Sequence, residues 1–359
     1  PFGAVSLAVG ETPGVCARLK TCILGGEPPV AGENQYNLTR IAGLQGNSFD
    51  EDEAVSDLTA GKLVEGNVAW MAVMNNYFMG VVSMPDPSAS AKGRYLGGVY
   101  HALIGRSNLA VSPDAPVSLE CTYYIGPKES KRLDAAPNHL DKALDYGFFS
   151  IVAKPLIWLL QFLYAYVHNY GVAIILMTII IKLIFWPLSQ KSYRSMQQMK
   201  QLQPLMVKIR EKYADDKEAM NREVMQLYKT YKVNPAGGCL PILVQLPVFI
   251  GLYKALLNSI ELRHAPFISS LPFTDIPWLT DLASPDPFFI TPLLMGATML
   301  LQQKMTPTPG DPTQAKIMML MPIIFTGLFL TFPSGLVVYW LVNNVISIGT
   351  QWRPLRKRT

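Results

Sequence analysis

The chain has 359 residues, of which 50% are hydrophobic and 16% are charged, and its formal net charge is +5. It is too apolar for an average soluble protein and too mixed for a chain buried entirely in lipid. Acidic residues outnumber basic ones in residues 1–140, whereas basic residues dominate 191–232 and the tail 352–359. Because this positive charge lies beside apolar segments, a membrane topology bias explains it better than a nucleic-acid substrate does.

Residues 1–140 predict a β-domain. They contain Gly, Pro and Asn turn clusters between short alternating runs, and residues 117–124 alternate apolar with polar side chains as a half-buried strand does. The chain begins with Pro1, so we expect a fragment of a longer product. Cys16 and Cys22 are expected to be two buried free thiols, and a disulfide between them is the alternative if the domain lies outside the cytosol.

Residues 146–168 predict an amphipathic helix that lies in the membrane interface. The segment is apolar and rich in aromatic residues, while Lys154, Gln161 and His168 recur at seven-residue steps and so share one stripe. Pro155 interrupts the apolar run early. A transmembrane span is the alternative, and it would move the β-domain to the other side of the membrane.

Five further apolar segments predict transmembrane helices, at residues 171–188, 240–260, 288–303, 317–332 and 336–351. Several hold about 16 to 18 residues, or roughly 24 to 27 Å of helix, which is less than the approximately 30 Å hydrocarbon core of an average bilayer. Such short spans thin the bilayer around them. Basic residues follow the first, third and fifth segments, so these flanks are expected in the cytosol and the β-domain outside.

Residues 190–233 predict a cytosolic helical hairpin. They are too polar to cross a membrane, and their apolar side chains fall on one face of each of two helices joined at Ala214-Asp215-Asp216. Methionine is flexible and suits varied apolar partners. The residues predicted to contact such partners are Met196, Met199, Met206, Met220 and Tyr228. The alternative is that these side chains only pack the two helices together.

Lys182 is the only charged residue in the apolar run 171–188. A charge at that depth costs about 2.5 to 3.5 kcal/mol on insertion scales, so it is expected to face water or protein. Thr178 lies one turn before it on the same helical face. The other spans contribute Gln245, Trp340, Asn343 and Asn344, and none of the five spans contains Asp or Glu. These residues predict a polar, hydrated groove that carries a single positive charge.

Spaced motifs from about residue 144 to 351 resemble the YidC membrane-protein insertase family (YidC/Oxa/Alb). These motifs are Asn234-Pro235-x-Gly237-Gly238-Cys239-x-Pro241, Gln245-x-Pro247, Glu261-Leu262-Arg263-x-Ala265-Pro266-Phe267, Asp286-Pro287-Phe288-Phe289-Ile290-x-Pro292, Gln303-Lys304-Met305 and Phe332-Pro333-Ser334-Gly335-Leu336-Val337. Upstream, residues 67–85 and Tyr124-Ile125-Gly126-Pro127-Lys128 resemble the end of the periplasmic β-sandwich of Gram-negative members. We expect the start of that domain and the first transmembrane helix to be missing.

The resemblance implies a multi-pass α-helical protein of the bacterial inner membrane, with a periplasmic β-sandwich portion and a five-helix core at 171–351 that includes the hairpin. It implies an insertase and chaperone that moves newly made membrane-protein segments from the cytosol into the bilayer without ATP. The ribosome, membrane lipids and the Sec translocon are the further partners considered. An arginine of the family corresponds to Lys182, which keeps the charge but loses the planar fork that grips a carboxylate at two points. Thr178 and Trp340 correspond to client-contacting positions.

Two other kinds of function are weighed. A solute transporter or channel would need a continuous path, usually with coupling acids or inverted repeats. A sugar- or peptide-binding β-domain with the helices as its anchor would leave Lys182, Gln245 and Asn343 unexplained. An enzyme is not expected, because the sequence has scattered histidines and no evident catalytic triad order, phosphate loop, metal-ligand cluster or cofactor motif.

Overall fold

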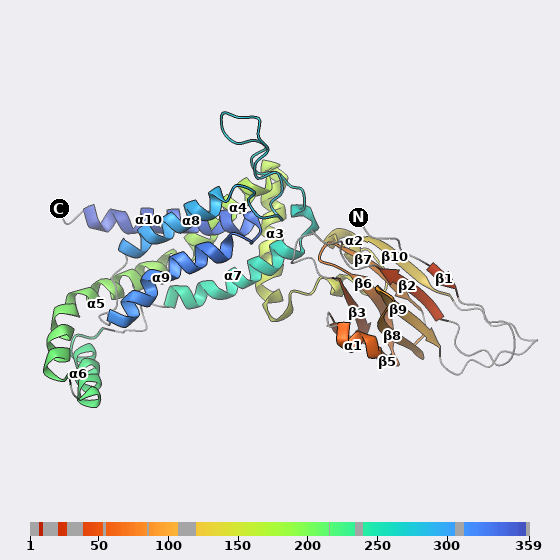
Figure 1. Ribbon diagram of the computed structural model, residues 1–359, viewed down its shortest axis with the longest axis horizontal. Helices are drawn as coiled ribbons and strands as arrows, with labels where there is room; N and C mark the ends of the chain where they lie inside the picture. The colour runs from red at the N-terminus through yellow and green to blue at the C-terminus, as the bar shows by residue number, and fades with distance from the viewer. Residues whose placement is uncertain are drawn as a thin grey trace, which may run out of the picture. The chain divides into compact units, whose positions relative to one another are not determined.

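The computed structural model describes residues 7–9, 21–26, 39–52, 55–84, 86–106, 120–214, 216–233, 240–305 and 312–356 (Figure 1). The chain divides into two compact units, one of Pro1–Gly147 with Leu257–Glu261 and the other of Phe148–Leu256 with Leu262–Thr359. Cys16, the 234–239 part of the first family motif and the side chains of the basic tail lie outside the described residues, as does the side chain of Cys22.

The first unit contains two antiparallel five-stranded sheets, as expected for a β-sandwich portion. One sheet has the order β1 (Leu7–Val9), β2 (Thr21–Gly26), β9 (Val99–Arg106), β8 (Ala89–Leu96) and β5 (Lys62–Glu65). The other has the order β10 (Thr122–Pro127), β7 (Phe78–Ser83), β6 (Val68–Met74), β3 (Arg40–Gln45) and β4 (Ser48–Asp52). The short helices α1 (Val55–Ala60) and α2 (Ser130–Asp134) complete the unit, with a 3-10 turn at Leu140–Ala143.

Alternate side chains of the strands form the core of this unit. Ile41, Met71 and Val73 come from one sheet and Ala91 and Ile104 from the other, and all five are nearly inaccessible to solvent. Such alternation is what a strand needs when one of its faces is buried. Cys121 is disulfide-bonded, a state that persists in oxidising compartments outside the cytosol. This cysteine was not one of the two considered for a disulfide.

A buried cationic pair lies at the end of β10. Lys128 is 3% exposed and its backbone N–H donates to the carbonyl of Tyr77 (2.7 Å). Arg40 is also buried, with its Nε 3.0 Å from Glu51 Oε2 and its Nη1 donating to Asn76 Oδ1 (3.3 Å). Loss of hydration is the main cause, and the charge of Arg40 the next, of a pKa of Lys128 that is lowered from 10.5 to about 7.

The second unit is helical. It contains α3 (Ser150–Val167), α4 (Tyr170–Ile184), α5 (Trp186–Lys212), α6 (Lys217–Thr230), α7 (Leu240–Asn258), α8 (Ile290–Met305), α9 (Pro312–Phe329) and α10 (Ser334–Arg356). α10 packs against both α4 and α8, and α8 packs against α9 (Figure 1). Its core includes Ile174 and Met177 of α4, Leu252 of α7, Met295 of α8 and Tyr339 of α10.

Length and hydropathy single out one described helix as able to cross a membrane, Gly147–Val167, with 21 residues and a mean hydropathy of 1.6. α4 and α5 pass the same test only as a bent pair, and Val244–Asn258 and Met318–Phe329 are shorter apolar helices. The helix at 146–168 therefore remains open to both interpretations, interfacial or spanning. The membrane placement of the other segments stays a prediction.

The predicted first span, 171–188, is not one continuous helix. α4 ends at Ile184 and α5 begins at Trp186, with a bend of 63° between them. Pro187 explains the break, because its nitrogen carries no hydrogen to donate and its ring would collide with the carbonyl of residue 183. Proline is well placed in the first turn of the new helix. α5 and α6 then pack against each other, and Asp216 caps α6 by accepting from Ala219 N (2.9 Å).

The start of α4 is held closely against the loop that precedes α8. Asn169 caps α4 by accepting from Val172 N (3.0 Å), and its amide donates to the carbonyl of Phe267 (3.1 Å). A Cβ placed on Gly171 would overlap the ring of Phe267. Glycine is therefore required at this position by close approach, whereas Gly349 in α10 has open space around it.

We expect Gly171→Ala to destabilise the helical unit by about 1 to 3 kcal/mol, because the added methyl group forces Phe267 to move. Gly349→Ala is the matched control and should stabilise by up to about 1 kcal/mol through helix propensity. The measurement is thermal unfolding of both purified variants in the same detergent. Equal transition temperatures for the two variants would contradict the close contact.

Lys128 should make the β-unit more stable as pH rises from about 7 towards 10.5. In that window the unfolded chain carries the Lys128 proton and the folded chain does not, so folding releases a proton. Hydrogen–deuterium exchange of β7 and β10 in the intact chain, corrected for intrinsic exchange rates, measures this dependence. Lys128→Met should flatten it, and an unchanged slope in that variant would rule out Lys128 as its source.

Candidate functional site

Lys182 contacts a hydroxyl group of another helix. It lies in the last turn of α4, two residues before the helix ends, and is half-buried. Its ammonium donates to Ser347 Oγ of α10 (2.8 Å). Ser347 is buried, and its own hydroxyl donates to the carbonyl of Asn343 (2.7 Å). The lysine is thus directed at protein and towards α10, as a cation in an apolar helix requires.

α10 presents a polar stripe to its neighbours. Tyr339, Asn343 and Ser347 recur at four-residue steps and therefore share one helical face. The amide of Gln245 on α7 donates to Asn343 Oδ1 (2.7 Å) and lies 3.4 Å from the hydroxyl of Tyr339. Side chains of α4, α7 and α10 are consequently joined through polar contacts within an otherwise apolar bundle.

A small hollow of about 20 Å³ opens beside these contacts. It is lined by Ile181, Lys182, Phe185, Leu188, Ser189, Val244, Gln245, Val248 and Asn343. Among these described lining residues, Lys182 is the only one with an ionisable side chain. The hollow has room for about one water molecule, which is far less than an extended peptide needs.

The structure brings together three of the six residues predicted for the groove, Lys182, Gln245 and Asn343. Thr178 is fully buried, and its hydroxyl donates to the carbonyl of Ile174 within α4 (2.6 Å). Asn344 faces α8, where its amide donates to Thr298 Oγ1 (3.3 Å). Contact of any of the six with a client stays a prediction.

Trp340 belongs to an aromatic cluster formed by α7, α9 and α10. Its ring lies 4.9 Å from that of Phe249 in an edge-on arrangement, 5.4 Å from Phe329 and 6.0 Å from Phe325. Such pairs add stability beyond their buried area. Phe249 lies one turn beyond Gln245 on α7, so the same helical face changes from polar to aromatic within four residues.

Ser347 and Tyr339 were not among the residues predicted for the groove. Both could have been recognised from the sequence, because a polar side chain occurs at every fourth position of this apolar helix, at residues 339, 343, 347 and 351. Ser347 is too short a side chain to stand out alone, and a serine hydroxyl in a helix commonly bonds its own backbone, as this one also does.

The hairpin residues separate into buried and half-buried groups. Met206 and Tyr228 are buried against each other, with the tyrosine hydroxyl 3.5 Å from the methionine sulfur, and Met199 packs beside them. Met196 and Met220 are half-buried. The exposed apolar side chains of the hairpin are Val207, Met225 and Tyr231, which the predicted set omits. Client capture by the methionines remains a prediction.

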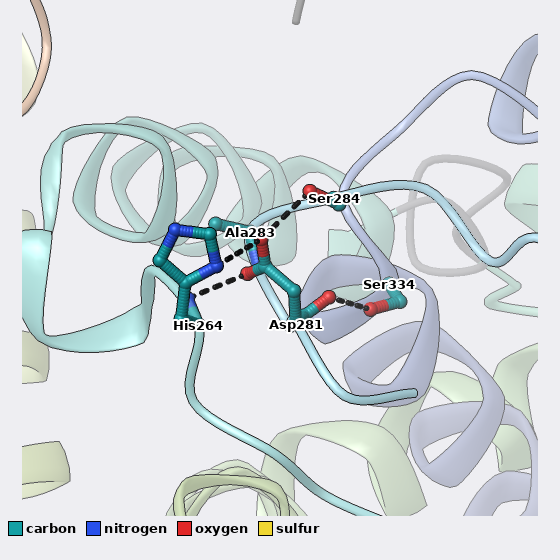
Figure 2. Close-up of polar contacts among 5 residues, drawn as sticks. All are labelled: His264, Asp281, Ala283, Ser284 and Ser334. Carbon is teal, nitrogen blue, oxygen red and sulfur yellow. Dashed lines mark hydrogen bonds and ion pairs between the residues drawn. The ribbon is translucent and has the colours of Figure 1, made fainter. Parts of the chain in front are cut away.

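Two aspartates organise the loop between α7 and α8. Asp281 Oδ1 accepts from the backbone of His264 (3.0 Å) and Ala283 (2.9 Å), and Ser284 Oγ donates to its Oδ2 (2.8 Å), as Figure 2 shows. Ser334, the first residue of α10, donates to the carbonyl of Asp281 (3.1 Å). The loop is thereby fastened to the start of α10.

This group contains serine, histidine and aspartate, but its geometry is not that of a nucleophilic relay. A relay needs the serine hydroxyl bonded to the histidine ring. Here Ser284 is directed at the Asp281 carboxylate, and His264 Nδ1 lies 3.6 Å from the same carboxylate (Figure 2). The arrangement is that of a carboxylate organising a turn.

Asp286 caps α8 in a comparable way. It is 1% exposed and its two oxygens accept four bonds. The indole of Trp278 (3.0 Å) and the backbone of Phe288 (3.0 Å) donate to Oδ1, and the backbone (2.7 Å) and hydroxyl (2.8 Å) of Thr291 donate to Oδ2. A buried carboxylate with this many donors is well compensated for its loss of hydration.

Comparison with known proteins gives two family matches. Residues 162–358 match the model described as 60Kd inner membrane protein, and residues 25–159 match the YidC periplasmic domain. The protein named Membrane protein insertase YidC of Nitratidesulfovibrio vulgaris is 60% identical over 334 residues, which is 93% of this chain and 62% of that protein. Its namesake in Oleidesulfovibrio alaskensis is 61% identical over 323 residues, covering 90% and 60%.

Among the solved structures that match is one titled as an active YidC insertase crystal structure with the first transmembrane domain resolved. It is 22% identical, covers 93% of this chain and 73% of that chain, and has a TM-score of 0.47. The present chain spans about three fifths of the length of the curated relatives it matches.

We expect Asp286→Asn to destabilise the helical unit by about 1 to 3 kcal/mol, because one amide group cannot accept all four donors. Asp275→Asn is the control, since Asp275 is an exposed aspartate of the same loop that takes no part in capping α8. Thermal unfolding in detergent, followed by the fluorescence of tryptophan, compares the variants. A transition temperature for Asp286→Asn equal to that of the wild type would contradict the capping role.

Proposed function

This chain belongs to the YidC family of inner-membrane proteins, and from that membership we propose that it inserts newly made membrane-protein segments into the bilayer. The β-unit is then periplasmic, and the hairpin α5–α6 is cytosolic. The names of the similar proteins support the activity, and the basic residues of 191–232 support the orientation. The proposed partners are nascent membrane proteins and membrane lipids. The ribosome would meet the protein in the cytosol, and the Sec translocon would meet it within the membrane.

The observation that carries the mechanism is the single cation of the hollow. Lys182 lies beside Gln245 and Asn343 with no acidic side chain among the described lining residues. A positive charge that is not neutralised attracts the acidic flank of a client, and the attraction is stronger in a partly dehydrated site than in water. Tyr339 and Asn343 of α10 provide further partners for a peptide backbone that would otherwise lose its hydrogen bonds in lipid.

Insertion requires the hollow to widen. At about 20 Å³ it is closed to a peptide, so α7 and α10 have to separate at the Gln245–Asn343 contact for a client to enter. Contacts of this kind are exchangeable, because an amide of the client can replace either partner. The aromatic cluster around Trp340 keeps the far side of the path closed while the apolar part of the client moves sideways into lipid. No nucleotide is needed in this scheme.

The hairpin is proposed to receive the client first. Val207, Met225 and Tyr231 are open to solvent and offer apolar contact without any rearrangement. Met206 and Tyr228 become available only if α5 and α6 separate, because the two side chains cover each other. The exposed residues are therefore the first contacts and the buried pair the later ones.

A solute channel or transporter is the competing function. A channel needs a continuous aqueous path, and the hollow beside Lys182 is too small to supply one in this conformation. Uptake of a defined solute, or a steady current, in liposomes that contain the protein and no client would favour the competing function.

The test uses the full-length protein reconstituted in liposomes with single-span clients that differ only in the charge of their amino-terminal tail. Lys182→Ala and Lys182→Glu should reduce insertion of the acidic-tailed client at least fivefold, which corresponds to about 1 kcal/mol, and Lys182→Arg should preserve it. The neutral-tailed client is the control and should be little affected. Equal insertion of the acidic client by the Ala, Glu and Arg variants would refute the electrostatic role.

A further inference from the structure

The Lys182 ammonium is held by an uncharged group of a distant segment. Ser347 Oγ accepts from Nζ at 2.8 Å, across 165 positions of sequence. The proton of Ser347 is already used, because the hydroxyl donates to the carbonyl of Asn343 at 2.7 Å. The oxygen lone pairs are therefore directed away from that carbonyl and are available to the ammonium. Of the two partners, Ser347 is buried and Lys182 is half-buried.

A lysine in this position needs such a partner to stay in the hollow. Lys182 lies two residues before the end of α4, and its flexible four-carbon stem can carry the ammonium out past the helix end. An arginine has five donors in a rigid fork and can hold several acceptors at once, whereas an ammonium is a compact charge on a mobile stem. The hydroxyl of Ser347 opposes the outward movement.

The choice of a hydroxyl also preserves the charge. A carboxylate at position 347 would bind the ammonium more tightly but would cancel its field. A neutral hydroxyl binds the ammonium more weakly than a carboxylate does, so a carboxylate brought in by another molecule can displace it. Ser347 thus matches a site that has to keep its cation in place and yet release it to an acid.

We propose that Ser347 is the positioning residue for Lys182: it holds the ammonium inside the hollow until an acidic group of the client replaces the hydroxyl. This inference rests on the proposed insertase function, but the contact itself can be tested without it. Its specific content is that Ser347 acts only through Lys182 and only on clients with acidic flanks.

The first experiment measures position directly. The full-length protein in liposomes is treated with a water-soluble amine-acylating reagent, and modification of Lys182 is followed by mass spectrometry. Ser347→Ala should speed modification several-fold because the ammonium can then reach the interface, and Ser347→Thr should restore the slow rate. Thr350→Val is the matched control, since the Thr350 hydroxyl bonds the carbonyl of Ser347 on the same helix (2.8 Å) and not the Lys182 ammonium. A rate unchanged by Ser347→Ala would overturn the proposal.

The second experiment is a double-mutant cycle on insertion. Ser347→Ala should lower insertion of the acidic-tailed client several-fold, leave the neutral-tailed client unchanged, and add no further loss to Lys182→Met. Equal losses for both clients, or a loss that persists in the Lys182→Met background, would show a general structural role and overturn the proposal. Failure of the wild-type protein to insert either client would refute the proposed function instead, and the labelling result would still decide the role of Ser347.

Discussion

One constraint organises the helical unit: a cation placed in an apolar helix has to find polar partners inside the bundle. Lys182 meets this constraint through Ser347, and Ser347 through the backbone of α10. The same face of α10 meets Gln245 of α7, so three helices converge on one set of polar groups. The position of α10 between α4 and α8 follows from these contacts and from the apolar core around Ile174 and Tyr339.

The two ends of α10 are held by different chemistry. At its start, Ser334 and Gly335 bond the loop that Asp281 organises, and Phe329, Phe332 and Trp340 pack as a set of rings. Further along the helix, Asn343 accepts one hydrogen bond from Gln245 and Ser347 accepts one from the Lys182 ammonium. Packed rings and multiply bonded carboxylates resist separation more than single hydrogen bonds do. An opening of the bundle is therefore easier beside Lys182 than beside the loop.

The sequence allowed the helices and the β-sheets to be predicted from local periodicity, and the contact of Lys182 with polar groups of the protein from the cost of a charge in an apolar run. It did not show which way each helix faces, since rotation about the axis is decided by packing between distant segments. Trp340 and Asn344 do share a face, as their spacing requires, but that face meets α7, α8 and α9 rather than Lys182. Ser347 was missed for the same reason, whereas the break at Pro187 could have been read from the sequence.

The bend at Phe185 ties the hairpin mechanically to the lysine. α5 has 27 residues and is joined to α4 through a single residue, immediately after the turn that carries Lys182. A helix of that length is a lever of about 40 Å, so a displacement of roughly 7 Å at its tip is a rotation of only about 10° at the pivot. A force on the tip of α5 therefore acts on the last turn of α4, which carries Lys182.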